Sequence, residues 1–286
     1  MKTILITGAS SGIGKETAIL FAKKGWNVVA TMRNPEHLLL FTDIKNIATY
    51  VLDVKDKSSV KSCIKQVAQD FGKIDVIVNN AGIYTTNPLE LTPDKTIDDI
   101  IETNIKGVLY TTKIILEHFR ENKSGIIVNV SSIAGRVTFP FQSIYHTSKW
   151  AIEGFSESLY YELKPLNIKV KIVEPGMVKT SIYNSVLNFP FEKYPDEYRT
   201  NFKKWHNFLM KSYKNGYLPE LDAKTIYKAV NSNNSKLRYT SDFTTKTVFF
   251  LRSLFPLSGF QNIINKQSAS QLPTSNRYTF FFKFFL

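Results

Sequence analysis

The chain of 286 residues is 43% hydrophobic and carries a formal net charge of +13 at pH 7. It can therefore bury one sizeable core, and no low-complexity linker or internal repeat divides it into two domains. The single cysteine, Cys63, excludes an intrachain disulfide and is typical of a reducing compartment, so we expect a cytoplasmic protein. The net charge alone does not indicate nucleic-acid binding, because such a surplus usually belongs to a solvated face.

A glycine-rich turn joins the first predicted strand to the first predicted helix. Residues 4–6 form an apolar run, and apolar side chains recur at helical spacing over residues 16–22. The glycines between them allow a sharp turn and the approach of a pyrophosphate, whose charge the N-terminus of the helix stabilises. The predicted phosphate-binding residues are Gly8, Ser10, Ser11, Gly12, Ile13 and Gly14. Because the strand begins so near the N-terminus, we expect no cleavable signal.

The choice of dinucleotide depends on the end of the second predicted strand, within residues 27–34. A site selective for NAD carries an acidic residue there, which accepts a hydrogen bond from the ribose 2′-hydroxyl and repels a 2′-phosphate. Met32 occupies the expected acidic position, and Arg33 follows it. The missing acid and the adjacent guanidinium favour NADP(H) over NAD(H).

Two further predicted strands, residues 74–78 and 126–130, end in residues suited to a ligand site. After the first strand, the small residues Ala81 and Gly82 let the chain pass close to a ligand, and an Asn beside them, Asn79 or Asn80, can tie neighbouring strands together. The second strand ends at Ser131 and Ser132, and either hydroxyl is placed to bind a substrate oxygen and to stabilise the charge that develops on it.

Tyr145 and Lys149 are four residues apart on a predicted helix, so their side chains lie on the same face. A nearby ammonium favours the phenolate, and we expect it to lower the pKa of the tyrosine from its usual value of about 10. Tyr145 is then the proton donor in reduction and the acceptor in oxidation. His146 is a weaker candidate for this base, because the adjacent helical position points elsewhere. No His, Cys and carboxylate cluster has ligand spacing, so no metal is expected.

These motifs, in this order, resemble the short-chain dehydrogenase/reductase family over roughly residues 1–183, and within it the NADP-preferring members of the hydroxysteroid and retinol dehydrogenase type. The resemblance implies an α/β fold with one doubly wound parallel sheet of the Rossmann type, and hydride transfer between a nicotinamide and a carbonyl or alcohol. It selects Ser132 over Ser131, assigns Lys149 to the nicotinamide ribose, and places Asn104 beside a water that links Lys149 to solvent. The implied catalytic residues are Asn104, Ser132, Tyr145 and Lys149.

The resemblance also implies cofactor contacts that the local sequence does not reveal. The end of the third predicted strand would meet the adenine ring, and the segment after the sixth strand, residues 170–174, would hold the nicotinamide carboxamide. These contacts would come from Asp53, Val54, Pro175, Gly176, Val178 and Thr180. One position argues weakly for NAD(H), because many NADP-using members carry a second basic residue where this chain has Ser11.

The last hundred residues depart from the family pattern. We expect residues 184–235 to form a helical substrate lid and residues 236–286 to supply the last strand and a C-terminal tail, all within a single domain. Aromatic and methionine side chains of residues 189–210 either line a pocket for a lipophilic substrate, such as a steroid, retinoid or fatty-acyl derivative, or simply pack a helical flap.

The C-terminal region is also the most basic part of the chain. Residues 187–286 carry 15 Lys and Arg against 6 Asp and Glu. The phenylalanine-rich end, residues 280–286, is too short to span a bilayer. It either rests on an anionic membrane surface or packs against the body or a second subunit, and we expect a homo-oligomer.

Two classes of function fit these observations. The first is an NADP(H)-dependent oxidoreductase for a lipophilic carbonyl or secondary alcohol, with a 3-oxoacyl reductase of fatty-acid synthesis as the variant that the long aromatic extension disfavours. The second is a non-catalytic sensor that binds the dinucleotide and reports redox state to a partner. Such sensors commonly lose the catalytic tyrosine or lysine, and this chain keeps both Tyr145 and Lys149.

Overall fold

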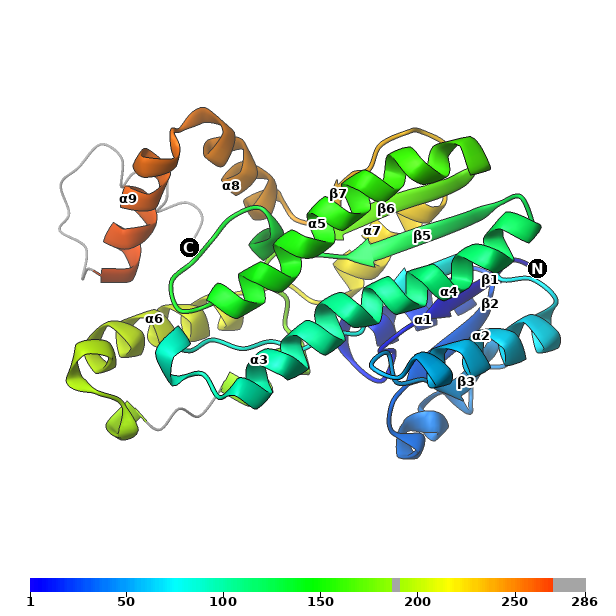
Figure 1. Cartoon of the computed structure of the whole chain (residues 1–286), viewed down its shortest axis with the longest axis horizontal. Coiled ribbons are helices and arrows are strands. Elements are labelled where there is room, and N and C mark those ends of the chain that lie inside the picture. Colours follow the sequence, from blue (N-terminus) through cyan, green and yellow to red (C-terminus); the bar gives the residue numbers. More distant parts are fainter. Residues whose placement is uncertain (187–190, 270–286) are drawn as a thin grey trace.

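Seven parallel strands form one sheet in the order β3-β2-β1-β4-β5-β6-β7 (Figure 1). The computed structural model describes residues 1–186 and 191–269. The strands are β1 (Thr3–Ile6), β2 (Asn27–Met32), β3 (Ile47–Val51), β4 (Val76–Asn79), β5 (Gly125–Val130), β6 (Ile168–Glu174) and β7 (Arg238–Thr240). The strand order reverses between β1 and β4, and ligands of such sheets bind beyond the carboxyl ends of the strands at this switch point.

Helices cover both faces of the sheet, which is why its central strands are apolar on both sides. On one face, α1 (Gly12–Lys23) packs against β1 and β2, and α7 (Glu220–Val230) packs beside α1 against β5, β6 and β7, with Phe21 fully buried there. On the other face lie α2 (Lys57–Phe71), α4 (Gly107–Glu121) and α5 (Ser143–Leu163), with Phe119 fully buried. Burial of each such ring stabilises the fold by about 1.5–3 kcal/mol. The predicted doubly wound parallel sheet is confirmed.

The chain between β4 and β5 contains an irregular helix. It begins as α3 (Asp94–Ile100), widens into a π-helical turn over Ile101–Lys106 and continues as α4. Such turns occur frequently at functional sites. Short 3₁₀ segments lie at Pro35–Phe41, Leu89–Leu91, Ile133–Gly135, Lys164–Leu166, Ser181–Val186 and Phe191–Lys193.

Three helices lie beyond one end of the sheet: α6 (Asp196–Lys214), α8 (Phe243–Leu254) and α9 (Leu257–Ala269) (Figure 1). Trp205 and Leu209 of α6 are buried in a cluster with Tyr84 and Tyr145, so this helix packs against the region of the predicted catalytic tyrosine. Over residues 1–186 and 191–269, no helix is long and apolar enough to cross a membrane. The predicted membrane contact of residues 280–286 lies outside the described residues.

Candidate active site

The glycine turn after β1 leaves no room for side chains. Gly8 and Gly12 have positive φ angles of 65° and 53°, which L residues with a side chain rarely adopt. A Cβ atom on Gly8 would lie 2.7 Å from the Cα of Ala81, and one on Gly14 would lie 2.4 Å from the carbonyl oxygen of Gly8. The first two glycines therefore shape the turn, and the third lets α1 pack closely against it.

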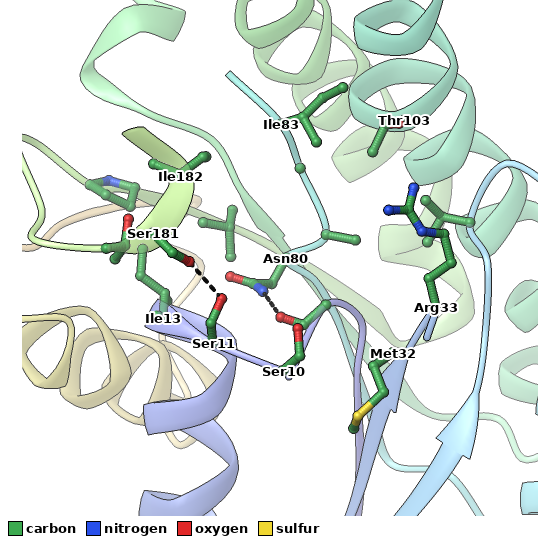
Figure 2. Close-up of a pocket in the computed structure, with 18 of the residues that line it drawn as sticks. Ser10, Ser11, Ile13, Met32, Arg33, Asn80, Ile83, Thr103, Ser181 and Ile182 are labelled. Carbon is green, nitrogen blue, oxygen red and sulfur yellow. Dashed lines mark hydrogen bonds between the residues drawn. The ribbon is translucent and has the colours of Figure 1, made fainter. Parts of the chain in front are cut away.

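A cavity of about 310 Å³ opens at the carboxyl ends of the strands, bounded by this turn. Figure 2 shows Ser10 and Ser11 on the turn and Arg33 at the end of β2, around one part of the cavity. The predicted cofactor residues that line it are Gly8, Ser10, Ser11, Gly12, Ile13, Arg33, Asp53, Val54, Asn80, Ala81, Gly82, Tyr145, Lys149, Pro175, Gly176, Val178 and Thr180. Gly14 is not part of the lining, because its place is in the packing behind the turn.

Asn80 helps to build the turn. Its side-chain N–H groups donate to the carbonyl oxygens of Thr7 at 2.9 Å and Gly8 at 3.0 Å. The hydroxyl of Thr7 accepts from the backbone N–H groups of Asn80 and Ala81, both at 3.0 Å. The ends of β1 and β4 are thus joined by these four hydrogen bonds, while Asn79 bonds Asn129 of β5.

Ser132, Tyr145 and Lys149 meet at the other part of the cavity. The Ser132 hydroxyl hydrogen-bonds the Tyr145 phenol and also accepts from the N–H of Ala134 at 3.1 Å. Lys149 Nζ donates to the carbonyl oxygen of Val130 at 3.0 Å and lies 5.8 Å from the centroid of the Tyr145 ring. The alternative serine, Ser131, is also buried and also lines this cavity, so the selection of Ser132 over Ser131 stays a prediction.

The expectation that Lys149 lowers the pKa of Tyr145 is wrong. Burial raises the pKa of Tyr145 to about 12, and the hydrogen bond with Ser132 offsets this only in part. Burial likewise lowers the pKa of Lys149 to about 8, with Glu153 partly opposing the shift. Desolvation dominates because the ammonium is bound to Val130 and does not reach the phenol oxygen. Tyr145 is therefore a neutral phenol at pH 7, the form that can donate a proton.

Asn104 lies in the π-helical turn and is 2% exposed. Its oxygen accepts from the N–H of Ile83 at 2.9 Å, and its nitrogen donates to the oxygen of Ile83 at 2.8 Å and to Ser148 Oγ at 3.1 Å. Ser148 in turn donates to the carbonyl oxygen of Tyr145 at 2.7 Å. Asn104 thus fixes the chain after Gly82 against the catalytic helix α5, while its link to a water stays a prediction.

His146 is held as a neutral imidazole. Its Nε2 accepts from the N–H of Phe139 at 2.8 Å, so the proton lies on Nδ1, which donates to the oxygen of Ala134 at 2.8 Å. Burial lowers the pKa of this ring. His146 therefore holds the loop between Ser132 and α5 in place. Both of its ring nitrogens are used in these hydrogen bonds, so Tyr145 stays the stronger candidate for the catalytic acid and base.

The far part of the cavity surrounds Arg33. Met32 is buried at 2% exposure, whereas Arg33 is exposed, and its guanidinium has no hydrogen bond or ion pair with any residue in the described parts of the chain. Lys55 also lines this part, but Asp99 and Glu102 bind its ammonium at 2.8 and 2.7 Å. No motif in the sequence marks four further lining residues of this part, which are Asn34, His37, Leu52 and Lys55.

A second cavity of about 400 Å³ adjoins the first, and Ser132, Tyr145, Gly176 and Tyr183 line both. Its walls are mainly aromatic and aliphatic, and they come from loops and from α6, α8 and α9. The large apolar lining residues are Tyr84, Phe139, Met177, Trp205, Phe208, Leu209, Leu221, Val248 and Ile264. The sequence left open whether the aromatic residues of the C-terminal region line a pocket or pack a helix. In the structure they pack α6 and also line this cavity.

Tyr217, between α6 and α7, contacts the segment between the two cavities. Its backbone N–H donates to Met177 O at 3.1 Å, its carbonyl oxygen accepts from Lys179 N–H at 2.8 Å, and its hydroxyl accepts from Gly176 N–H at 3.0 Å. The same hydroxyl donates to Asp222 Oδ1 at 3.1 Å. Nothing in the local sequence marks Tyr217, because its role depends on how α6 folds back on the sheet.

The first cavity suits a dinucleotide. The turn approaches the cavity as closely as its glycines allow, Arg33 lies at the far part, and Ser132, Tyr145 and Lys149 lie where the second cavity begins. Residues 2–189 match the family model of short chain dehydrogenase. The chain belongs to the short-chain dehydrogenase family and is an oxidoreductase of that family. Within residues 1–186 and 191–269, no group of three or more His, Cys, Asp and Glu is placed to hold a metal.

Relatives match both the core and the C-terminal part. The uncharacterized oxidoreductase YusZ of Bacillus subtilis is 36% identical, over 93% of this chain and 98% of its own. The 3-ketodihydrosphingosine reductase of Bacteroides thetaiotaomicron is 34% identical, over 82% and 86%. The 3-oxoacyl-[acyl-carrier-protein] reductase FabG of Thermotoga maritima is 38% identical, over 63% and 75%. The structure of ElxO with NADP bound has a TM-score of 0.71 and 30% identity, and covers 86% of this chain and 99% of its own.

Proposed function

We propose that this protein is an NADP(H)-dependent oxidoreductase that transfers a hydride between the nicotinamide and a lipophilic carbonyl or secondary alcohol. The observation that carries the proposal is the meeting of the two cavities at Ser132 and Tyr145. One cavity has the glycine turn that phosphates require, and the other is large and apolar. Tyr145, the proposed proton donor, lies where a dinucleotide in the first cavity would meet a substrate in the second.

The residues of the chain suit the proton part of this reaction. The nicotinamide, when bound, supplies or accepts the hydride. Ser132 would donate a hydrogen bond to the carbonyl oxygen, which stabilises the negative charge that develops there. Tyr145, a neutral phenol with its pKa raised to about 12, would donate the proton to that oxygen. Tyr145 is therefore protonated at neutral pH, as a proton donor in reduction must be.

Arg33 supports the choice of NADP(H). Its guanidinium is exposed beside the cavity, and a guanidinium can pair with a phosphate through two charge-assisted hydrogen bonds. Met32, buried beside it, supplies no carboxylate to repel a 2′-phosphate. The bound NADP in the ElxO structure agrees with this choice, although other similar structures hold NADH.

The apolar walls of the second cavity support a lipophilic substrate. Residues of α6, α8 and α9 contribute to these walls, and we propose that residues 184–235 act as the substrate lid. The relative named 3-ketodihydrosphingosine reductase is in keeping with a lipophilic ketone. Hydroxysteroid or retinoid substrates, a homo-oligomeric state and membrane contact stay predictions.

A 3-oxoacyl reductase is the second candidate, because the Thermotoga maritima relative carries that name. That match covers 63% of this chain, whereas walls of the second cavity extend to residue 264, in α9. The sensor function is disfavoured, since the chain keeps Tyr145 and Lys149 and both lie close to Ser132 at the cavity.

A panel of carbonyls and alcohols, followed by the absorbance of the reduced dinucleotide, tests the proposal. We expect oxidation of NADPH by medium- and long-chain ketones, with NADH used less well. Sugars and short acids should react slowly. Consumption of neither dinucleotide by any ketone, in a protein that binds both, would favour the sensor instead.

A further inference from the structure

A buried carboxamide faces the apolar second cavity. Gln142 immediately precedes α5, three residues before Tyr145, and is 5% exposed. It lines the second cavity together with Phe139, Trp205 and Tyr145. Its backbone oxygen accepts from the N–H of His146 at 2.8 Å, so the main chain at this position is fixed.

The carboxamide of Gln142 has no hydrogen bond with any residue in the described parts of the chain. Other buried amides are bound: the Asn79 and Asn129 side chains bond each other at 2.8 Å, and Asn104 is held by Ile83 and Ser148. The polar atoms of the Gln142 side chain are not among those that are both unpaired and fully shielded from solvent, so they keep some accessible surface. Its amide therefore reaches the open space of the cavity. An amide in such a place costs free energy unless a ligand satisfies it.

The position of Gln142 determines what it would meet. Gln142 is the N-cap residue of α5, and its side chain lines the same cavity as Tyr145. When Ser132 and Tyr145 bind the carbonyl oxygen of a substrate, the Gln142 amide therefore lies near substrate atoms that are a few bonds from that carbonyl. The amide is neutral and offers both donors and an acceptor. Asp242 lines the same cavity, and its carboxylate disfavours a negatively charged substrate.

We propose that Gln142 is a specificity-determining residue that binds a second, neutral oxygen of the substrate close to the reacting carbonyl. The substrate class is a lipophilic ketone with an ester, thioester, amide or hydroxyl oxygen about two carbons away, rather than a plain ketone or a free acid. This inference rests on the proposed reductase function. A site whose buried amide is left unpaired rejects the analogue that lacks the matching group.

The test compares ethyl 3-oxooctanoate with 6-undecanone, which has the same chain length and lacks the ester oxygens. We expect the wild type to prefer the ester by about tenfold in kcat/KM, the size of one hydrogen bond to a buried neutral group. In Gln142→Leu, which has similar size and no polar atoms, the ratio of the two values should fall toward one. The control is Gln66→Leu, the same change at an exposed glutamine of α2 bonded to Asp70. It should keep the ratio of the wild type.

Binding gives a second readout that does not need turnover. Dissociation constants of the two compounds, measured by calorimetry with NADP⁺ in the Tyr145→Phe background, should show the same preference and its loss in Gln142→Leu. A ratio that Gln142→Leu leaves at the wild-type level would overturn the inference, even if both ketones are reduced. Failure to reduce either ketone would instead count against the proposed function, while the binding ratio still decides the role of Gln142.

Discussion

The hydroxyl of Tyr217 accepts the backbone N–H of Gly176 at 3.0 Å, which joins the lid region directly to the segment after β6. That segment lines the first cavity at Gly176 and Val178, and Tyr217 itself lines the second. One residue outside the family motifs thus connects the proposed cofactor site to the proposed substrate site.

Removal of this hydroxyl should loosen the cofactor segment. Tyr217→Phe leaves the Gly176 N–H unpaired, and a buried donor without a partner costs about 1–3 kcal/mol. We expect the KM for NADP(H) to rise by about 5-fold or more, with the reaction's pH profile unchanged. Tyr161→Phe, at a residue 67% exposed, is the matched control. An unchanged KM for NADP(H) in Tyr217→Phe would contradict a positioning role.

The choice of dinucleotide should depend on Arg33 and Met32. Arg33→Ala should weaken NADP(H) binding by about 10- to 150-fold, the equivalent of about 1.5–3 kcal/mol for a charge-assisted contact, with little change for NAD(H). Met32→Asp should invert the preference, because the carboxylate repels a 2′-phosphate and accepts from a 2′-hydroxyl. Titration of both dinucleotides into the three proteins checks this. Tighter binding of NAD(H) by the wild type would show that the argument from β2 is wrong.

Lys149 should make the stability of the cofactor-free protein depend on pH. Burial lowers its pKa from 10.5 to about 8, so between these values the unfolded chain binds more protons than the folded protein. Stability then rises with pH over this window. The pKa of Lys171 is also lowered to about 8, so this residue also makes stability rise with pH. Its contribution is present in both the wild type and Lys149→Met. Chemical denaturation at pH 7 to 10 should show a smaller rise in Lys149→Met. Equal slopes would mean that Lys149 is not desolvated.

Two glycines in helices on opposite faces of the sheet should respond oppositely to alanine. A Cβ on Gly14 would lie 2.4 Å from Gly8 O and 2.5 Å from Asn80 Nδ2, so Gly14→Ala should destabilise the protein and abolish dinucleotide binding. Gly154, within α5, has no atom of residues 1–186 or 191–269 within 4 Å of an added Cβ, so Gly154→Ala should stabilise the protein by about 0.5–1 kcal/mol. Thermal unfolding measures both changes. Equal stability of the two variants would contradict the packing described at the turn.

The sequence predicted the sheet and the cofactor cavity well, for a physical reason. Buried parallel strands are continuous apolar runs, and each ends in a turn that the topology brings to one edge. The chain around Gly8, Asn80 and Ser132 could therefore be placed from its local pattern. Gly14, predicted to bind phosphate, packs behind the turn and does not line the cavity, because a glycine needed for packing has the same sequence signature as one that admits a ligand.

Features that depend on long-range packing were missed. The direction of the Tyr145 pKa shift follows from burial under Tyr84 and Tyr183, which contact it or lie near it only in the folded chain. Gln142 and Tyr217 have no motif, and their roles appear only once α6 closes over α5 and β6. Helical spacing correctly put Lys149 beside Tyr145, but it could not show that the ammonium bonds Val130.

The central claim is that Tyr145 donates the proton, and the Tyr145→Phe variant tests it most directly. The change keeps the ring that packs against Tyr84 and removes the transferable proton. With a ketone that the wild type reduces, turnover should fall by at least roughly 100- to 10,000-fold, the range of general acid catalysis, while the dissociation constant of NADP(H) stays nearly the same. Turnover close to that of the wild type, in a variant that still binds NADP(H), would contradict the account.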